Sequence, residues 1–209
     1  MTIENEDYIW YASYGSNISE ERFKCYIKGG KPEGATRTYL GCKDQNPPMG
    51  QKAIKIPHEL YFAKSAGVWN GGGVCFINPE KSENADTLGN MYLITCQQFL
   101  EVVQQENNTN EPINIDFNKT QKEKSLVVRE NSWYGNLLYL GEECDAPIFT
   151  FTNDKYLINE INAPNPHYLK TIIRGLIATH QLSKSQLEDY FLFKIGMDQT
   201  IIAEVINQL

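Results

Sequence analysis

Two features of the chain could carry out chemistry: a small polar turn near its start and one glutamate much later. The turn is Tyr14-Gly15-Ser16-Asn17, and it follows an aromatic run from Tyr8 to Tyr11 that favours a β-strand. A glycine turn between a strand and a helix leaves several backbone N–H groups free and pointing the same way. These donors and the positive end of the helix dipole together make a site for an anion. The same residues also fit an ordinary strand-to-helix turn with no ligand.

Glu106 is expected at the C-terminal end of a second helix. Thr95 is a good N-cap for that helix, and Asn107 begins the polar stretch that ends it. The negative end of the helix dipole disfavours a carboxylate there, so partial burial should raise the pKa of Glu106. A raised pKa suits a group that both takes and gives a proton. Glutamates also occur at exposed helix ends without any role, and the local pattern leaves both interpretations open.

Other common catalytic patterns are missing from the sequence. His58, His167 and His180 do not have the spacing of metal ligands, and there is no Cys-x-x-Cys pair. Ser16 does not lie in the Gly-x-Ser-x-Gly pattern of a nucleophilic serine. We therefore expect neither a metal nor a cofactor.

The composition argues against several classes of partner. The 209 residues carry a formal net charge of −7 without a cluster of lysines or arginines, which argues against nucleic acid and anionic membranes. No apolar run approaches the roughly 20 residues that span a bilayer, and the acidic N-terminus is unlike a signal peptide. Five scattered cysteines argue against a disulfide framework. We expect one cytoplasmic domain over residues 1–209.

The hydrophobic pattern predicts strands first and helices later. Strands are expected at residues 8–13, 35–42, 60–63, 73–77, 88–94, 126–128, 137–140 and 148–151, and helices after the turn and at 96–106, 165–180, 183–193 and 199–208. Gly71-Gly72-Gly73 precedes a strand rather than a helix, so it predicts a bulge or a close backbone approach, not a phosphate loop. The polar residues 107–124 predict a long loop or insertion.

Three segments, taken in order, resemble the γ-glutamylcyclotransferase-like family. The first is the turn Tyr14-Gly15-Ser16-Asn17 after its short aromatic strand. The second runs from Gly89-Asn90-Met91-Tyr92 through Gln97-Gln98-Phe99-Leu100 to Gln105-Glu106, and is similar to the strand and helix that deliver the family's catalytic glutamate. The third, Ala163-Pro164-Asn165-Pro166-His167-Tyr168, looks like the family's C-terminal Pro-x-Tyr helix. Together these segments extend over most of the chain.

The resemblance implies an α+β fold, a small mixed and partly open β-barrel flanked by helices. Strands near residues 8–13, 36–42, 73–77 and 88–94 are then expected in one curved sheet, with the helix from Cys96 beside it. The family releases 5-oxoproline from a γ-glutamyl compound by attack of the substrate's own α-amino group on its γ-carbonyl. Because the nucleophile belongs to the substrate, no catalytic serine, cysteine or metal is required.

The resemblance also assigns roles to residues. Glu106 matches the general acid and base, Tyr168 matches a tyrosine of the substrate pocket, and the turn from Tyr14 to Asn17 would hold the α-carboxylate or the developing oxyanion through backbone N–H groups. Ile18 and Ser19 extend the expected substrate-binding segment. Glu106 and the turn should therefore line one cavity.

The chain departs from the family pattern at three places. Asn107 follows the glutamate where glycine is frequent, the loop from Asn107 to Lys124 does not match that of well-known members, and Ile18 replaces a leucine or methionine. The substrate can be a γ-glutamyl amino acid, a γ-glutamyl amine or a γ-glutamyl isopeptide. We expect the protein to be a monomer or a homodimer. Two alternatives are a non-catalytic module that binds a carboxylate ligand and an amide hydrolase in which Glu106 activates water. The first is disfavoured because a binding module needs no base at this position.

Overall fold

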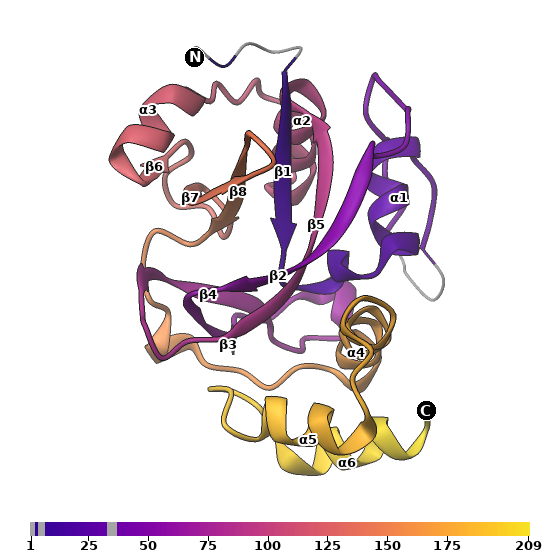
Figure 1. The fold of residues 1–209 in the computed structure, drawn as a ribbon. Helices are drawn as coiled ribbons and strands as arrows, with labels where there is room; N and C mark the ends of the chain where they lie inside the picture. Colours follow the sequence, from indigo (N-terminus) through magenta and orange to yellow (C-terminus); the bar gives the residue numbers. More distant parts are fainter. Residues whose placement is uncertain (1–2, 4–6, 33–36) are drawn as a thin grey trace.

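The protein has a mixed α+β architecture built around one central sheet (Figure 1). The computed structural model describes residue 3, residues 7–32 and residues 37–209. In spatial order, the strands of this six-stranded sheet are β2 (Gly50–Ile56), β5 (Thr87–Thr95), β1 (Tyr8–Ser13), β8 (Ala146–Thr152), β7 (Asn136–Glu143) and β6 (Ser125–Val127). A separate two-stranded sheet consists of β3 (His58–Ala63) and β4 (Val74–Lys81).

Strand β1 lies inside the sheet, antiparallel to β5 and parallel to β8. Its side chains alternate between two hydrophobic cores, as the period of two in a strand requires. Ile9 and Tyr11 enter one core, whereas Trp10 and Ala12 enter the other. Both faces of the sheet are therefore covered at β1, which explains why its residues are almost all apolar.

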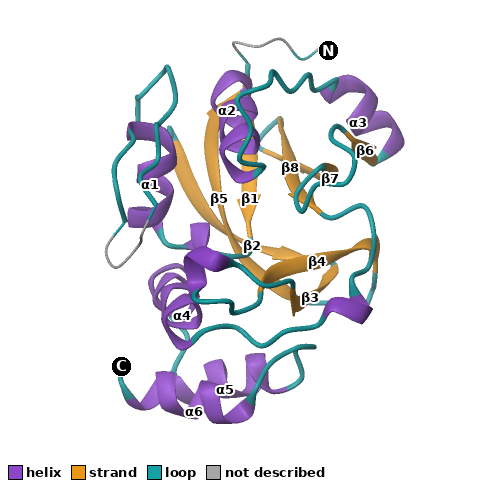
Figure 2. Cartoon of the chain, turned by 180° about the vertical axis from the view of Figure 1, so that it is seen from behind, coloured by secondary structure: helices purple, strands orange, loops and turns teal. Residues whose placement is uncertain are grey.

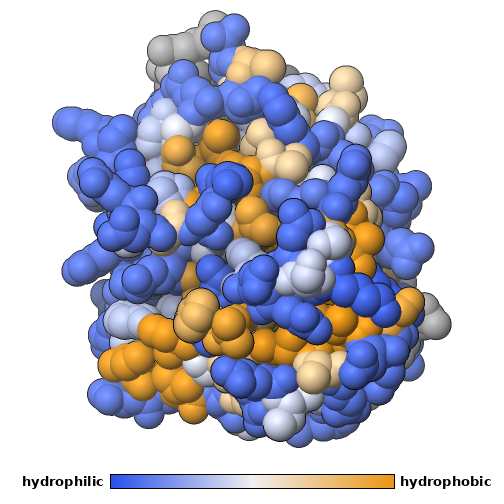
Figure 3. All heavy atoms as spheres, turned by 60° about the horizontal axis from the view of Figure 1, so that its bottom comes forward, coloured by the Kyte–Doolittle hydropathy of each residue, from blue (hydrophilic) through white to orange (hydrophobic). Residues whose placement is uncertain are grey.

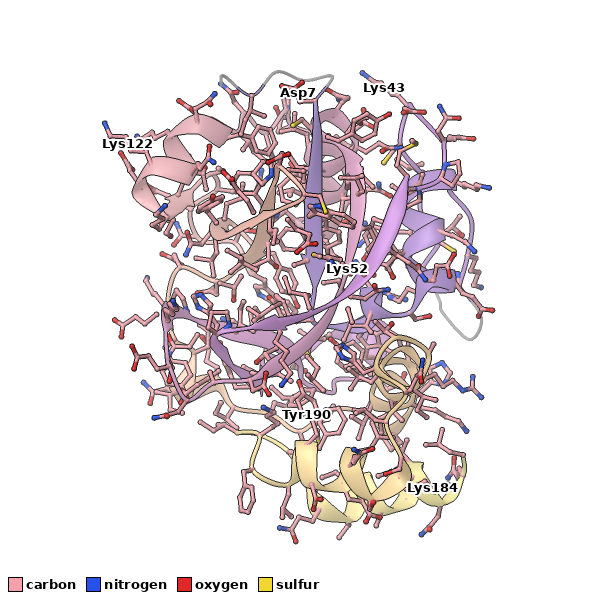
Figure 4. The ribbon with its side chains drawn as sticks, in the orientation of Figure 1. Asp7, Lys43, Lys52, Lys122, Lys184 and Tyr190 are labelled. Carbon is pink, nitrogen blue, oxygen red and sulfur yellow. The ribbon has the colours of Figure 1, made fainter. Side chains whose placement is uncertain are left out.

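Helices complete each core. The core around Tyr11 includes residues of α1 (Glu20–Lys28), α2 (Cys96–Glu106) and α3 (Phe117–Glu123), and α2 lies in front of β1 and β5 when the chain is seen from behind (Figure 2). The core around Trp10 includes residues of β3, β4, α4 (Pro166–His180), α5 (Lys184–Leu192) and α6 (Gln199–Asn207). Tyr190 points from α5 toward the sheet, where its hydroxyl accepts a hydrogen bond from the N–H of Leu88 at 3.0 Å (Figure 4).

The two sheets meet without a continuous backbone ladder, which makes the barrel partly open. Pro57 alone separates β2 from β3. On the other side, the hydroxyl of Thr152 in β8 donates to the carbonyl of Ile77 at 2.7 Å and accepts from its N–H at 3.3 Å. The α+β class is confirmed, but the expectation that residues 73–77 share a sheet with β1 and β5 is wrong, because β4 pairs with β3.

Two other expectations from the sequence are corrected. Of the predicted strand 35–42, residues 35 and 36 lie outside the described residues, and the rest forms no strand; Tyr39 makes one isolated bridge to Gly30. Residues 107–124 are not simply a loop, because Asp116 caps the helix α3 by accepting from the N–H of Lys119 at 2.8 Å. The hydrophobic pattern of the sequence also does not predict the strand β2.

Apolar side chains are also exposed on the face that carries the C-terminal helices (Figure 3). Phe193, directly after α5, is the most exposed of them at 85%, and Leu192 and Ile195 lie next to it in the chain. None of the described helices is both long and apolar enough to span a membrane.

Candidate active site

The predicted turn forms a single 3₁₀ turn between β1 and α1. Ser16–Ile18 makes this turn, closed by hydrogen bonds from Ile18 N–H to Gly15 C=O at 3.0 Å and from Ser19 N–H to Ser16 C=O at 3.2 Å. The N–H groups at the start of such a turn have no partner within it. A side chain at position 15 would place its Cβ 3.3 Å from the Tyr168 hydroxyl and 3.5 Å from Cys75 Cβ, so glycine lets the backbone approach both residues.

A narrow cavity lies beside this turn, with a volume of about 40 Å³. It brings together residues from β1, the turn, β4, the end of α2, β8 and α4. Its walls are Tyr11, Ser13, Tyr14, Gly15, Ser16, Asn17, Cys75, Glu106, Tyr134, Phe151 and Tyr168. The structure thus confirms that Glu106 and the turn line one cavity.

Glu106 is the last residue of α2, and its carboxylate faces the turn. Its Oε1 accepts a hydrogen bond from Asn17 Nδ2 at 2.8 Å. Asn17 is only 3% exposed, and Ser19 rather than Asn17 takes the N-cap position of α1. The start of α2 is fixed by a capping box between Thr95 and Gln98, which sets where the helix delivers its final residue.

The surroundings of Glu106 shift the pKa of its carboxyl group. Burial raises the pKa of its carboxyl, because the ionised form loses hydration. The positive charge of Arg22, hydrogen bonds from Tyr26 and Asn17, and the charge of Arg37 oppose this effect, yet the pKa of Glu106 stays above its ordinary value. A partly buried carboxylate with such partners can accept a proton and later release it.

Asn17 offers a second polar atom at the cavity. Its Nδ2 is engaged by Glu106, whereas its Oδ1 is buried and has no hydrogen-bond partner among the described residues. A buried acceptor without a partner costs free energy, so a ligand that donates a hydrogen bond to it would be stabilised. Glu106 and Asn17 Oδ1 together suit a positively charged or N–H-bearing ligand group.

Three tyrosines form the opposite wall. The hydroxyl of Tyr168 accepts from Cys75 N–H at 3.0 Å, that of Tyr134 donates to Cys75 C=O at 3.0 Å, and that of Tyr14 donates to Phe151 C=O at 2.7 Å. Burial raises the pKa of all three phenols, so they remain neutral. They shape the cavity and carry no charge.

The glycines before β4 hold α4, and with it Tyr168, in place. A Cβ at Gly73 would fall 1.9 Å from the carbonyl oxygen of Asn162, and one at Gly72 would fall 2.5 Å from the N–H nitrogen of Asn165, the N-cap of α4. The predicted close backbone approach at the triple glycine is confirmed.

Two predicted site residues do not line the cavity. Ile18 is 1% exposed and packs against Gly175 of α4, where a Cβ would approach Ile18 Cγ2 to 2.8 Å. Ser19 instead lines a groove between α1 and α4. The sequence analysis also missed Arg22, whose position four residues before Tyr26 places a charge on the buried face of α1. That spacing was the available signal.

No group of three or more His, Cys, Asp or Glu side chains suited to a metal ion occurs in the part of the chain that the structure describes.

Comparison with known proteins identifies the fold. No family model matches the chain. A solved γ-glutamyl cyclotransferase matches 97% of this chain and 100% of its own, with a TM-score of 0.52 and 15% identity. An uncharacterized protein from Homo sapiens matches 97% of this chain and 99% of its own, with the same TM-score of 0.52 and 15% identity. The chain therefore has the γ-glutamyl cyclotransferase fold.

One protein of similar sequence comes from a plant, and its name does not mention a γ-glutamyl cyclotransferase. Histone deacetylase 5 of Arabidopsis thaliana is 38% identical over 198 residues, which is 87% of this chain but 30% of that protein. The chain thus spans less than a third of the length of this curated relative.

Proposed function

We propose that this protein is an enzyme of the γ-glutamylcyclotransferase type, which releases 5-oxoproline from a small γ-glutamyl compound. The observation that carries the proposal is the hydrogen bond between Glu106 and Asn17 at 2.8 Å inside one cavity. It places a carboxylate of raised pKa next to the turn where an anionic group of the substrate would be held.

In the proposed reaction, Glu106 first takes a proton from the α-ammonium group of the substrate. The freed amine attacks the γ-carbonyl carbon, a five-membered ring closes, and the bond from that carbon to the leaving amine breaks. Glu106 then gives this proton to the leaving amine. The ring nitrogen still carries one proton too many after the attack, and the same carboxylate passes that proton to the departing amine, which leaves as an ammonium ion and returns Glu106 to its starting state. The ring closure is intramolecular, so holding the substrate in a folded conformation supplies much of the rate.

The two charged groups on the α-carbon of the substrate match different parts of the cavity. Asn17 Oδ1 and Glu106 would receive the α-ammonium, because both are acceptors and one is negative. The N–H groups of Gly15, Ser16 and Asn17 would hold the α-carboxylate or the oxyanion that forms on the γ-carbonyl. The cavity is small, so it would take only the charged and reacting groups of the γ-glutamyl part, and the leaving amine would extend outward.

Product analysis tests this proposal. The protein is incubated with a γ-glutamyl amino acid, a γ-glutamyl amine and a γ-glutamyl-lysine isopeptide, and the products are separated by mass. We expect 5-oxoproline and the free amine from at least one compound. Free glutamate would instead identify an amide hydrolase, and binding without any product would identify a binding module. Glu106→Gln serves as the control for contaminating activity.

A further inference from the structure

Arg22 is a buried cation behind the cavity wall. It is 7% exposed, and its Nε donates to Ser16 Oγ at 2.8 Å while its Nη2 donates to the Tyr39 hydroxyl at 2.7 Å. Its guanidinium also lies over the rings of Trp69, at 5.0 Å, and Tyr39, at 5.5 Å. No ion pair joins Arg22 to a carboxylate within the described ranges. A buried charge without a paired ion is costly, so its position calls for an explanation.

One donor of Arg22 ends on a buried phenol. The Tyr39 hydroxyl accepts from Arg22 Nη2 at 2.7 Å and from the Tyr26 hydroxyl at 3.2 Å, so both donors converge on one oxygen. A hydroxyl oxygen has two lone pairs and can accept both bonds. Tyr39 therefore fixes one end of the guanidinium.

The other donor of Arg22 reaches the turn directly, through the hydroxyl of Ser16. Asn17, the next residue of the turn, donates to Glu106 Oε1 at 2.8 Å. Through the turn, Arg22 is therefore connected both to the general base and to the segment that would hold the substrate's anionic group. Aromatic rings against the guanidinium limit its movement.

We propose that Arg22 is a positioning residue that couples the turn to Glu106. One donor holds Ser16, so that the neighbouring Asn17 keeps its hydrogen bond to the carboxylate, and the other donor anchors the guanidinium on Tyr39. This inference rests on the proposed function for its catalytic meaning. A planar guanidinium supplies two donors in a fixed fork, which the point charge of a lysine cannot reproduce.

The charge of Arg22 adds an electrostatic contribution. Arg22 lowers the pKa of Glu106, against the larger effect of burial, and Glu106 in turn raises the pKa of Arg22. The other titratable groups that face Glu106 are Tyr11 from β1, Tyr26 from α1, Arg37 from the loop after α1, and Tyr134 from the loop before β7. Arg37 is the other cation among them, and its Nη2 donates to Gln105 C=O at 3.0 Å.

The test separates geometry from charge with three variants in the full chain. Arg22→Gln removes the charge and the fork, Arg22→Lys keeps only the charge, and Tyr39→Phe keeps the charge but removes the acceptor that anchors Arg22 Nη2. We expect kcat/KM on the best substrate to fall by about 10- to 100-fold in Arg22→Gln, because small displacements at a reacting centre have such effects. The acidic limb of its pH profile should move to higher pH, since the carboxyl loses the cation that favours its ionised form.

The other two variants should lower kcat while the acidic limb of Arg22→Lys stays near that of the wild type. Arg174→Gln is the matched control, because Arg174 is an exposed arginine of α4 in the neighbouring groove and should leave all readouts unchanged. A second readout does not need turnover: the titration of the Glu106 carboxyl carbon by NMR, which should move to higher pH in Arg22→Gln and stay near that of the wild type in Arg22→Lys.

The outcomes distinguish the inference from the proposed function. If the wild type forms no 5-oxoproline, the proposed function is wrong, and the NMR titration alone decides whether Arg22 is coupled to Glu106. A folded Arg22→Gln with wild-type kinetics and titration would overturn the coupling. So would a loss of activity that merely follows the folded fraction, with an unmoved acidic limb. If Arg22→Gln does not fold, Arg22→Lys and Tyr39→Phe decide by kcat, and a wild-type kcat in both overturns the inference.

Discussion

The middle and the C-terminal end of α2 each carry an enclosed glutamate, and their surroundings differ. Glu101 is 8% exposed, and its two carboxylate oxygens accept from Lys43 N–H at 2.8 Å and from Gln97 Nε2 at 2.8 Å. Glu106 accepts from Asn17 at 2.8 Å and faces the cavity. Glu101 uses its oxygens to tie a loop to the helix, whereas Glu106 keeps part of its carboxylate toward a space that a ligand can enter. Glu101 and Glu106 therefore differ mainly in the hydrogen-bond partners of their carboxylates and in access to the cavity, not in whether they are enclosed.

Neutralising each glutamate in turn tests the difference between them most directly. Glu106→Gln should lower kcat by about 10²- to 10⁴-fold, because the amide has nearly the same shape but cannot take the proton of the α-ammonium. Steady-state rates of 5-oxoproline release measure this, with circular dichroism as the check on folding.

Glu101→Gln is the matched control on the same helix. It should keep wild-type turnover and lose about 1 kcal/mol of stability, because a neutral amide accepts less strongly from Lys43 N–H. Equal losses of turnover in the two variants would show that α2 matters only as a whole, and that the assignment of Glu106 as the base is wrong.

A charge at Asn17 should produce an intermediate effect. Asn17→Asp places a second carboxylate beside Glu106, and two like charges at this distance raise the pKa of the pair. Turnover at neutral pH should fall by about tenfold or more and recover as the pH rises. Asn17→Ala removes the donor without adding charge and should move the acidic limb less. The same pH profile for both variants would contradict the role of charge here.

The pH dependence of stability offers a smaller effect. The folded-state pKa of Glu106 is raised above the ordinary value of 4.5, so the folded protein binds this proton more tightly than the unfolded chain. The resulting stabilisation is fully present below pH 4.5 and is lost as the pH rises through the folded-state pKa. Glu106→Gln should therefore melt at or above the wild-type temperature at neutral pH, and the difference should shrink in acid. A variant that melts lower at neutral pH would make Glu106 a stabilising group.

The smallest effect is expected at Ser16. Ser16→Ala keeps the backbone N–H groups of the turn but removes the acceptor of Arg22 Nε. Turnover should fall by less than about tenfold, which corresponds to one hydrogen bond. A loss as large as that of Glu106→Gln would mean that the Ser16 hydroxyl itself contacts the reacting atoms.

Local signals in the sequence were enough to place α2 correctly. Thr95 and Gln98 form a capping box that marks the helix start, and the observed helix ends at Glu106 as predicted. The proximity of Glu106 to the turn came instead from the family resemblance, because no local pattern links residues so far apart in the chain.

The failures have a different physical origin. β2 is an edge strand whose side chains are mostly exposed, so it has no clear hydrophobic alternation and is held by its pairing with β5. Tyr39 is buried by a tilted ring contact with Tyr26, with 4.3 Å between the ring centroids, and by the partners of its hydroxyl rather than by a sheet. Both are decided by tertiary contacts, which override local propensity.

The inside position of β1 has a consequence for how the chain is made. β1 precedes both of its partners in the chain, since β5 and β8 end at Thr95 and Thr152. Until β8 has been synthesised, one edge of this apolar strand lacks its partner in the sheet. Pairing between segments so distant in the sequence slows folding and leaves the nascent chain prone to aggregation. The yield of soluble protein should therefore depend on chaperone capacity and rise when translation is slowed at low temperature.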